Sequence, residues 1–172
     1  RRTTTAAGQV IDLCGEVTLS VVAVNGNGVR SSDENAKSLV VKAQFGAIDM
    51  VVGGDLTGDS PDIESRVAAA IGEVEVYKVH HHGSSTSSNL ALINALRPTT
   101  SFISLAANNS FGHPSPMTIA NLTTAGSEIW QTEDPVTGIK RGHVTLLSVD
   151  GVHYEVDQGL YGSQHVAKGY EA

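Results

Sequence analysis

Three polar clusters of the chain contain residue types that can do chemistry, and each follows an apolar run. Asp55 comes after two glycines, three histidines at 80–82 precede Gly83 and Ser84, and His113 closes an asparagine-rich loop. Imidazole is a good zinc ligand and a base near neutral pH. A carboxylate next to imidazoles suits a zinc or manganese site, and a pair of such ions can activate water.

Strands must bring these clusters together. The β-branched residues and Tyr77 across 74–79 predict a buried strand that ends in the histidines. The apolar runs 47–52 and 99–105 precede the other two clusters. If the three strands are neighbours, their carboxyl ends meet at one edge of a sheet, where open α/β folds place their chemistry.

The remaining pattern predicts an α+β domain. Antiparallel strands are expected from the apolar runs 9–13, 17–24, 38–45 and 47–52. Helices are expected from Ser60 to Gly72, from Ser87 or Ser88 to Pro98, and from Ser115 to Gly126. A short strand near 129–130 and a hairpin over 143–156 follow. The order β-β-β-β-α-β-α-β-α-β-ββ predicts a mixed sheet covered by helices on at least one face.

Composition limits the function classes. The 172 residues suit one domain, and the net charge of −7 argues against gripping nucleic acid by bulk charge. Cys14 is the only cysteine, so an internal disulfide and a thiolate metal cluster are both excluded. No apolar run is long enough to span a membrane. The Ser-, Thr- and Asn-rich surface segments slightly favour an exported protein over a cytoplasmic one, and localisation is otherwise unknown.

Structural explanations compete with each chemical one. An aspartate after Gly-Gly is more often a turn residue, and His113 beside a proline can be a packed loop residue. Successive strand side chains alternate faces, so only one or two of the three histidines can enter one site. The serines from Ser84 onward can simply cap the next helix. No phosphate-binding loop of the P-loop type is present. The Gly-x-Ser-x-Gly motif is also absent, and this argues against a serine hydrolase.

Five segments together resemble a known family. They are Ser38-Leu39-Val40, Gly54-Asp55-Leu56, the run Lys78-Val79-His80-His81-His82-Gly83-Ser84, Arg97-Pro98, and Asn108-Asn109-Ser110-Phe111-Gly112-His113-Pro114. The chain resembles the carboxyl-terminal half of metallo-β-lactamase-fold hydrolases, and is most similar to the ComEC-like branch. That branch includes the hydrolase domain of DNA-uptake channels and relatives that act on phosphodiesters.

The resemblance implies a fold and its limits. It extends from about Gly8 to Val156, so residues 1–156 are expected to form the carboxyl-terminal half of a metallo-β-lactamase αββα sandwich. Residues 157–172 are expected to be a tail. The complete domain of this family would hold two zinc ions, with manganese as an alternative.

The resemblance also implies roles for single residues. Asp55 matches the aspartate that bridges the two metals, and either His81 or His82 matches the last histidine ligand. His82 and His113 are the expected catalytic residues. The non-ligand histidine of the pair would contact substrate or lie beside the metal ligands, and His113 matches a family position near the site. Ser84 and Asn109 are expected beside the ligands.

One departure limits the resemblance. The family's main metal motif, His-x-His-x-Asp-His or His-x-Asp-x-Asp-His, is absent from this sequence and would lie in an amino-terminal half. Zinc needs about three protein ligands. We therefore expect the chain alone to bind metal weakly or not at all and to be inactive. Its expected partner is that missing half, or a second copy in a homodimer formed through the exposed surface.

The predicted parent function is metal-dependent hydrolysis of a phosphodiester or related ester by activated water, with nucleic acid as one such substrate. The alternative from another class is a non-catalytic interaction domain that kept the fold without a working metal site. A hydrolase of acyl or lactam bonds would differ only in substrate. His80 stands where relatives often have Pro or Ala, so it is left outside the core site.

Overall fold

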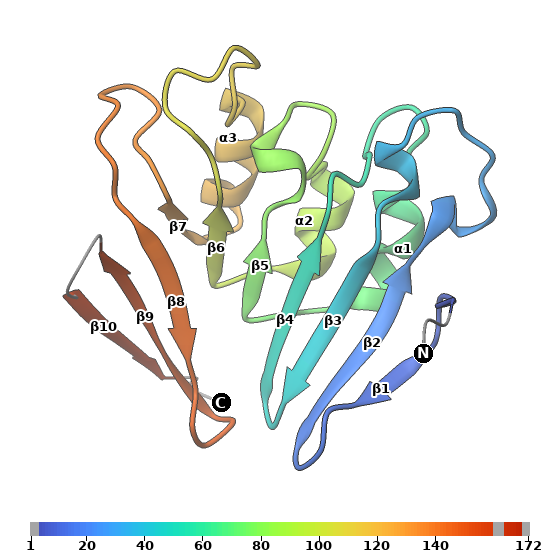
Figure 1. Ribbon diagram of the computed structural model, residues 1–172, viewed down its shortest axis with the longest axis horizontal. Coiled ribbons are helices and arrows are strands. Elements are labelled where there is room, and N and C mark those ends of the chain that lie inside the picture. The colour runs from blue at the N-terminus through green and yellow to red at the C-terminus, as the bar shows by residue number, and fades with distance from the viewer. Residues whose placement is uncertain (1–3, 160–163, 170–172) are drawn as a thin grey trace.

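The computed structural model describes residues 4–159 and the backbone of residues 164–169 (Figure 1). Its larger sheet has seven strands that follow each other in sequence order. They are β1 (Val10–Asp12), β2 (Val17–Ala23), β3 (Val40–Phe45), β4 (Ile48–Gly53), β5 (Val76–Lys78), β6 (Thr100–Ile103) and β7 (Glu128–Gln131). Strands β1 to β4 pair antiparallel, and β4 to β7 pair parallel.

Three helices cover one face of this sheet (Figure 1). They are α1 (Glu64–Ile71), α2 (Leu90–Leu96) and α3 (Pro116–Thr124). Each helix links two neighbouring parallel strands by a right-handed crossover. Because β4 to β7 follow one another in the same direction across the sheet, such crossovers place all three helices on the same face. Their apolar side chains pack with Val51, Tyr77 and Ile103 of the strands as the main core. None of the described helices is long and apolar enough to cross a bilayer.

A smaller sheet lies on the opposite face, next to β5–β7. It consists of β8 (His143–Leu147), β9 (His153–Gly159) and β10 (Gln164–Gly169), all antiparallel. Tyr154 and Val156 of β9 pack against Val76 and Phe102 in a second apolar cluster. The Tyr154 hydroxyl also lies 2.9 Å from the hydroxyl oxygen of Thr100, which fixes the small sheet against β6.

The order of elements from β1 to β9 agrees with the sequence prediction, and the structure adds β10 after them. The α+β class is confirmed, as is the mixed sheet covered by helices, which lie on one face. The layers run helices, large sheet, small sheet, as expected for part of an αββα sandwich. Three short 3₁₀ turns occur in loops, η1 (Asn25–Gly28), η2 (Asn35–Lys37) and η3 (His80–Gly83).

Two helix starts predicted from the sequence are wrong. The first helix begins at Glu64, after Ser60, and its N-cap position Ile63 makes no side-chain cap, while the nearby Asp62 carboxylate accepts the N–H of Ser65 at 2.9 Å. The second begins after Ser88, because the side chain of Asn89 is the N-cap. Of these two helices only α2 has a side-chain cap, and there an asparagine, which is as good a cap by type, stands in place of the serine before it. The predicted start of α3 agrees with the structure.

The segment expected to be a tail contains regular structure. Strand β9 continues to residue 159, and β10 pairs along it from residue 164 to 169. Residues 160–163 and 170–172 lie outside the described part of the chain. The domain boundary after residue 156 therefore stays a prediction.

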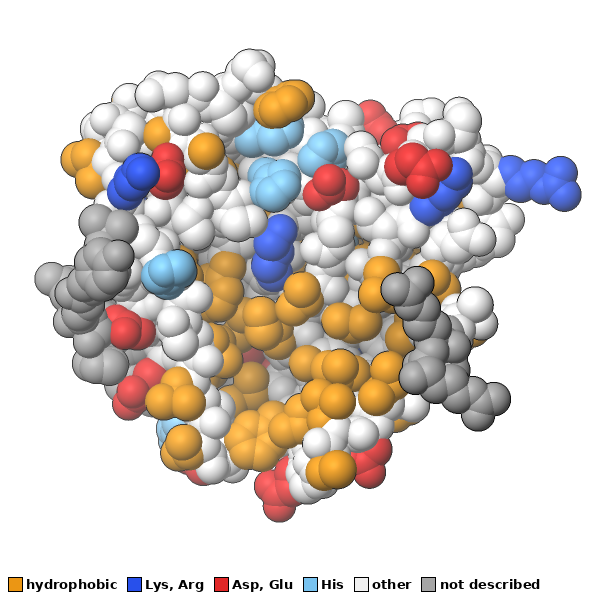
Figure 2. All heavy atoms as spheres, viewed as in Figure 1, with side chains coloured by type: hydrophobic (Ala, Val, Ile, Leu, Met, Phe, Trp, Pro, Cys, Tyr) orange, Lys and Arg blue, Asp and Glu red, His pale blue; other side chains and the backbone are white. Residues whose placement is uncertain are grey.

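Part of the helix-free face of the large sheet remains apolar and accessible. Pairing places Val17 opposite Phe45 and Ile11 opposite Leu19, so these side chains share one face. Ile11 is exposed and the other three are half-buried. Figure 2 shows hydrophobic side chains gathered over this face, below the histidines. An accessible apolar face of this extent is typical of a surface that packs against something else.

The two sheets approach closely at one pair of turns. Gly46, between β3 and β4, lies so near Gly151, between β8 and β9, that a Cβ atom on Gly46 would sit 2.4 Å from the Gly151 carbonyl oxygen. The N–H of Ala47 donates to the same oxygen at 2.6 Å. Gly46 also has a φ of +59°, a conformation that L side chains rarely adopt.

We expect Gly46→Ala to destabilise the protein more than Gly15→Ala. Gly15 also has a positive φ in a hairpin turn, +76°, but a methyl group on its Cα would have no neighbour within 4 Å. The left-handed strain is therefore common to both variants, and the clash with Gly151 is specific to the first. The difference in the free energy of unfolding should be about 1–3 kcal/mol, measured by urea denaturation. Equal losses would contradict the backbone contact between the sheets.

Candidate functional site

The three polar clusters lie at one edge of the large sheet. Strands β4, β5 and β6 are neighbouring parallel strands, so their carboxyl ends are adjacent. Asp55 follows β4, η3 follows β5, and the loop with His113 follows β6. Figure 2 shows histidine side chains side by side in this region, next to an acidic group.

The side chains at this edge affect one another. The rings of His81 and His113 meet edge to face with centroids 5.5 Å apart. The pKa of His113 is lowered from 6.5, first by partial burial and then by the nearby His81 and His82, while the Asp55 carboxylate opposes the shift. Asp55 likewise opposes the effect of burial, which lowers the pKa of Lys78. Neutral imidazoles beside a carboxylate can accept a proton or donate a lone pair.

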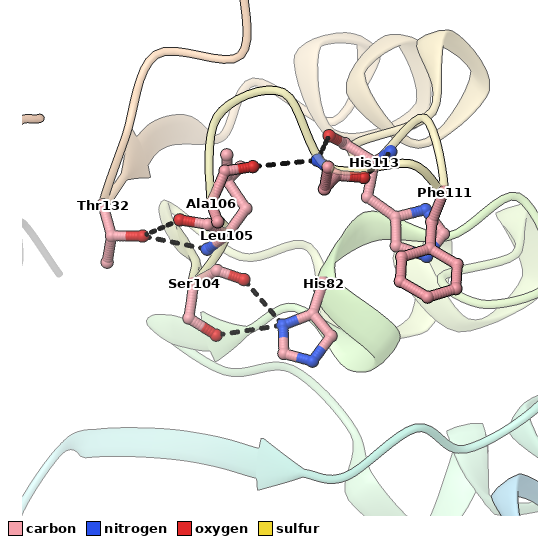
Figure 3. Close-up of a pocket in the computed structure, with 8 residues that line it drawn as sticks. His82, Ser104, Leu105, Ala106, Phe111, His113 and Thr132 are labelled. Carbon is pink, nitrogen blue, oxygen red and sulfur yellow. Dashed lines mark hydrogen bonds between the residues drawn. The ribbon is translucent and has the colours of Figure 1, made fainter. Parts of the chain in front are cut away.

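His82 has one ring nitrogen fixed by the backbone. Its Nδ1 lies 2.7 Å from the carbonyl oxygen of Ser104 (Figure 3). A carbonyl oxygen can only accept, so this Nδ1 carries the proton and donates it. In the neutral form of such a ring, Nε2 carries the lone pair. Binding of one histidine nitrogen by a backbone carbonyl is the usual way to orient the other as a ligand or base.

The histidine turn η3 has an unusual backbone. Both His81 and His82 have left-handed conformations, with φ of 49° and 53°. For residues with side chains this costs about 1–2 kcal/mol each, so surrounding contacts must hold the turn. The N–H of His81 donates to the Gly54 carbonyl at 3.2 Å, and the N–H of Ser115 donates to the Gly83 carbonyl at 2.7 Å. The turn is thus tied to the loops after β4 and β6.

Beneath this turn lies a fully buried contact between an imidazole and a carboxylate. The Nδ1 of His80 is 2.7 Å from the Glu64 carboxylate, and both side chains are 0% exposed. The same carboxylate accepts the backbone N–H groups of Ser88 and Asn89, each at 2.8 Å. One buried carboxylate therefore joins the start of α1, the histidine turn and the start of α2.

Two further contacts extend this buried network. The hydroxyl of Tyr77 accepts the N–H of His80 at 3.1 Å and lies 2.9 Å from the Ser88 hydroxyl. Burial, and then the Glu64 charge, raise the pKa of Tyr77 well above 10.0, so its hydroxyl stays protonated. The His80 Nε2 has no hydrogen-bond partner. A Cβ atom on Gly53 would sit 2.4 Å from it, so a glycine is needed where β4 passes the ring.

The two residues expected beside the ligands lie in the loops that shape the site. Ser84 is buried, and its hydroxyl pairs with the hydroxyl of Thr86 at 3.0 Å. Asn109 accepts the N–H of His113 at 3.0 Å, while its amide nitrogen donates to the His113 carbonyl at 2.8 Å. Asn109 therefore fixes the backbone that carries His113.

Asp55, His81, His82 and His113 are suitable zinc or manganese donors by type. Within the described part of the chain, however, no three His, Cys, Asp or Glu side chains gather closely enough to hold a metal ion. A complete metal site would need further ligands or a movement of these side chains. The residues present therefore fit part of such a site.

Sequence reasoning missed the Glu64–His80 pair. From the sequence, Glu64 is expected to be an acidic residue at the start of a helix, and His80 is expected to lie outside the site. A usable signal is present, because Glu64 precedes the buried Val67, Ala68 and Ile71 at helical spacing and so shares their face. Phe111 was also missed, although a lone aromatic residue in a polar loop is unusual.

We expect Glu64→Ala to lower the free energy of unfolding by about 3–5 kcal/mol, because three buried donors each lose a partner at a cost of about 1–3 kcal/mol. Removing the carboxylate leaves the buried His80 ring and two N–H groups without their acceptor. The matched control is Glu73→Ala, whose pair with Arg97 at 2.8 Å is largely exposed. That control should cost no more than about 1 kcal/mol. Urea denaturation measures both, and similar losses would contradict the role assigned to Glu64.

In metal-free protein, an NMR titration should show His113 with a pKa below 6.5. Asp55→Asn should lower this pKa further, because a negative charge that favours the imidazolium is removed. His81→Ala should raise it. The folded-state pKa of His113 is depressed, so its contribution to stability is complete above the ordinary pKa and declines as the pH falls below it. Asp12→Asn, on the distant β1, is the control; an unchanged His113 pKa in Asp55→Asn would contradict the proximity of the two groups.

No family model matches the chain. It is 30% identical over 106 residues to Competence protein ComA of Neisseria gonorrhoeae, and this match covers 60% of the chain and 15% of that protein. It is 34% identical over 83 residues to ComE operon protein 3 of Bacillus subtilis (strain 168), covering 48% of the chain and 11% of that protein. The chain thus matches only a small part of the length of either relative.

Among solved structures, the chain is similar to CmlA, a diiron β-hydroxylase from Streptomyces venezuelae. The TM-score is 0.47 at 14% identity, and the match covers 73% of this chain and 32% of that one. A likeness of this extent carries no argument about function. The two Com proteins are the informative relatives, and they support the superfamily that the sequence motifs resemble.

Proposed function

We propose that this chain provides part of the catalytic site of a metal-dependent hydrolase of the metallo-β-lactamase superfamily, acting on a phosphodiester or related ester bond. The observation that carries the proposal is the shared edge of β4, β5 and β6. Asp55 and the histidine turn meet there with the loop of His113, which is where an α/β sheet places its chemistry.

The residues at this edge have different roles in the proposed reaction. Asp55 and one histidine of the pair 81–82 contribute ligands to a metal centre that the rest of the domain completes. When bound, zinc or manganese would supply activated water and an electrophile for an ester oxygen. His82, with its Nδ1 proton held by Ser104, directs Nε2 outward. His113 is kept neutral near pH 7 by its lowered pKa and can accept a proton.

An anionic ester fits the charges at this edge better than a neutral one. Lys78 is half-buried on β5, and the nearby Asp55 carboxylate favours its charged form. A cation therefore lies beside the candidate ligands. Lys78 and the imidazoles are the groups at this edge that could oppose an anionic charge in a chain with a net charge of −7. Phosphodiesters are therefore preferred over acyl or lactam substrates in this proposal.

The proposed partner is an amino-terminal half of the same fold. The accessible apolar face that includes Ile11, Leu19 and Phe45 supports this partner, because removing apolar surface from water is favourable. A homodimer through the same face is the alternative arrangement. In either case the added part would bring the ligands that the described residues do not provide.

A second candidate function is a non-catalytic interaction domain. The observation that favours it is the lack, among the described side chains, of three gathered metal ligands. The two proposals differ in what precedes Arg1 in the encoded protein. A His-x-His-x-Asp-His or His-x-Asp-x-Asp-His motif there supports the hydrolase, and a full-length protein without either supports the interaction domain.

The full-length encoded protein should hydrolyse bis(p-nitrophenyl) phosphate when supplied with zinc or manganese. Asp55→Asn and His82→Gln should each lower kcat/KM by at least about 100-fold, the upper end of what loss of an outer-shell partner costs. Asp12→Asn, on β1 and away from this edge, should have no effect. The 172-residue chain alone should bind less than one equivalent of metal and show no turnover.

Two results would contradict this proposal. One is full metal occupancy with turnover by the 172-residue chain, which would show that its own residues complete the site. The other is normal activity of the full-length Asp55→Asn variant. Activity on acyl or lactam substrates with none on phosphodiesters would replace the proposed substrate class while leaving the site in place.

A further inference from the structure

A cavity of about 410 Å³ opens directly beside His82 and His113 (Figure 3). Its volume falls in the range of about 300–1,000 Å³ that is typical of small-molecule sites. It lies between the loop after β6 and the start of the loop after β7. The remaining walls are Ser104, Leu105, Ala106, Asn109, Phe111 and Thr132.

Most polar groups in these walls already have partners within the protein. The Thr132 hydroxyl donates to the Leu105 carbonyl at 2.7 Å and accepts the Leu105 N–H at 2.8 Å. The Asn109 amide donates to the Ala106 carbonyl at 2.9 Å. The groups available to a bound molecule are therefore mainly apolar surface and ring faces, with the His82 Nε2 on one side. Such walls favour an uncharged occupant.

Phe111 forms the outer wall. Its side chain is 78% exposed, an unusual position for a large aromatic residue in a loop. The ring is stacked on His113, with an interplanar angle of 19° and centroids 5.7 Å apart. In Figure 3 it lies at the mouth of the cavity, on the side away from Leu105. A rigid, exposed ring of this kind is a stacking platform for another flat ring.

We propose that this cavity is a binding subsite for a flat, uncharged ring on one side of the ester bond, with Phe111 as the residue that selects it. The inference rests on the proposed function and adds a substrate class to that site. The ring would lie between Phe111 and the Leu105–Ala106 wall, and the anionic ester group attached to it would then lie beside His82 and His113. Both an aryl group and a nucleobase have the required chemistry.

The test measures binding to the 172-residue chain without turnover. Chemical shifts of ¹⁵N-labelled protein are followed during titration with phenyl phosphate and, separately, with methyl phosphate, which has the same charged group without a ring. Phenyl phosphate should shift the amides of Leu105 and Ala106 and bind more tightly than methyl phosphate. Thymidine 5′-monophosphate distinguishes the two sources: the same shifts assign a nucleobase, and shifts with phenyl phosphate alone assign an aryl ester.

Variants connect the binding to the ring of Phe111. Phe111→Ala should weaken phenyl phosphate binding about tenfold and leave methyl phosphate unchanged, because only the stacking face is lost. Phe111→Trp should retain binding. Met117→Ala, an exposed apolar residue of α3 outside the cavity walls, is the matched control. Ala106→Leu should also weaken the binding of phenyl phosphate, because the larger side chain narrows the cavity.

Equal binding of phenyl and methyl phosphate, or equal binding by Phe111→Ala and the unmodified chain, would overturn the proposal. These outcomes do not depend on hydrolysis. If the full-length protein proves inactive, the subsite can still be observed, and if the subsite fails, hydrolysis by the full-length protein can still be observed.

Discussion

The buried contact between Glu64 and His80 is the constraint on which the candidate site depends. A carboxylate with no exposed surface is costly unless it is hydrogen-bonded, and here it accepts three N–H groups, one from the histidine turn and two from the start of α2. Because Glu64 itself lies at the start of α1, these contacts join the histidine turn to the starts of both helices that flank β5. The left-handed backbone of His81 and His82 is strained by itself and is stable only on such support.

From this base the geometry of the edge follows step by step. The turn is fixed below by Glu64 and at the sides by the Gly54 and Ser115 backbones. Its two outer histidines then face different surroundings: His81 lies against the His113 ring, and His82 is bound to the Ser104 carbonyl. Two neighbouring imidazoles thus have distinct environments, one against a ring and one against a backbone carbonyl, an arrangement suited to distinct roles in one site.

Much of this fold could be predicted from the sequence, and the reasons are local. The alternating or continuous apolar runs indicate the strands, and Asp150-Gly151 indicates the hairpin of β8 and β9. The starts of α1 and α2 could not be placed to the residue, since Ser60 and Ser88 are good caps by type. In the structure α1 begins at Glu64 without a side-chain cap, and Asn89 caps α2. The meeting of Asp55, His81 and His113 at one edge followed from strand order. The buried pairing of Glu64 with His80 joins residues far apart in sequence, and no local pattern specifies it.

The accessible apolar face has a consequence for the behaviour of the chain in solution. With a sequence pI of about 5.4, the repulsion between molecules that comes from negative charge at neutral pH disappears in mildly acidic buffer. Sulfate and similar salts strengthen the burial of apolar surface. Solubility should therefore be lowest where weak acidity and such salts coincide, and conditions on the alkaline side with chloride should keep the molecules apart.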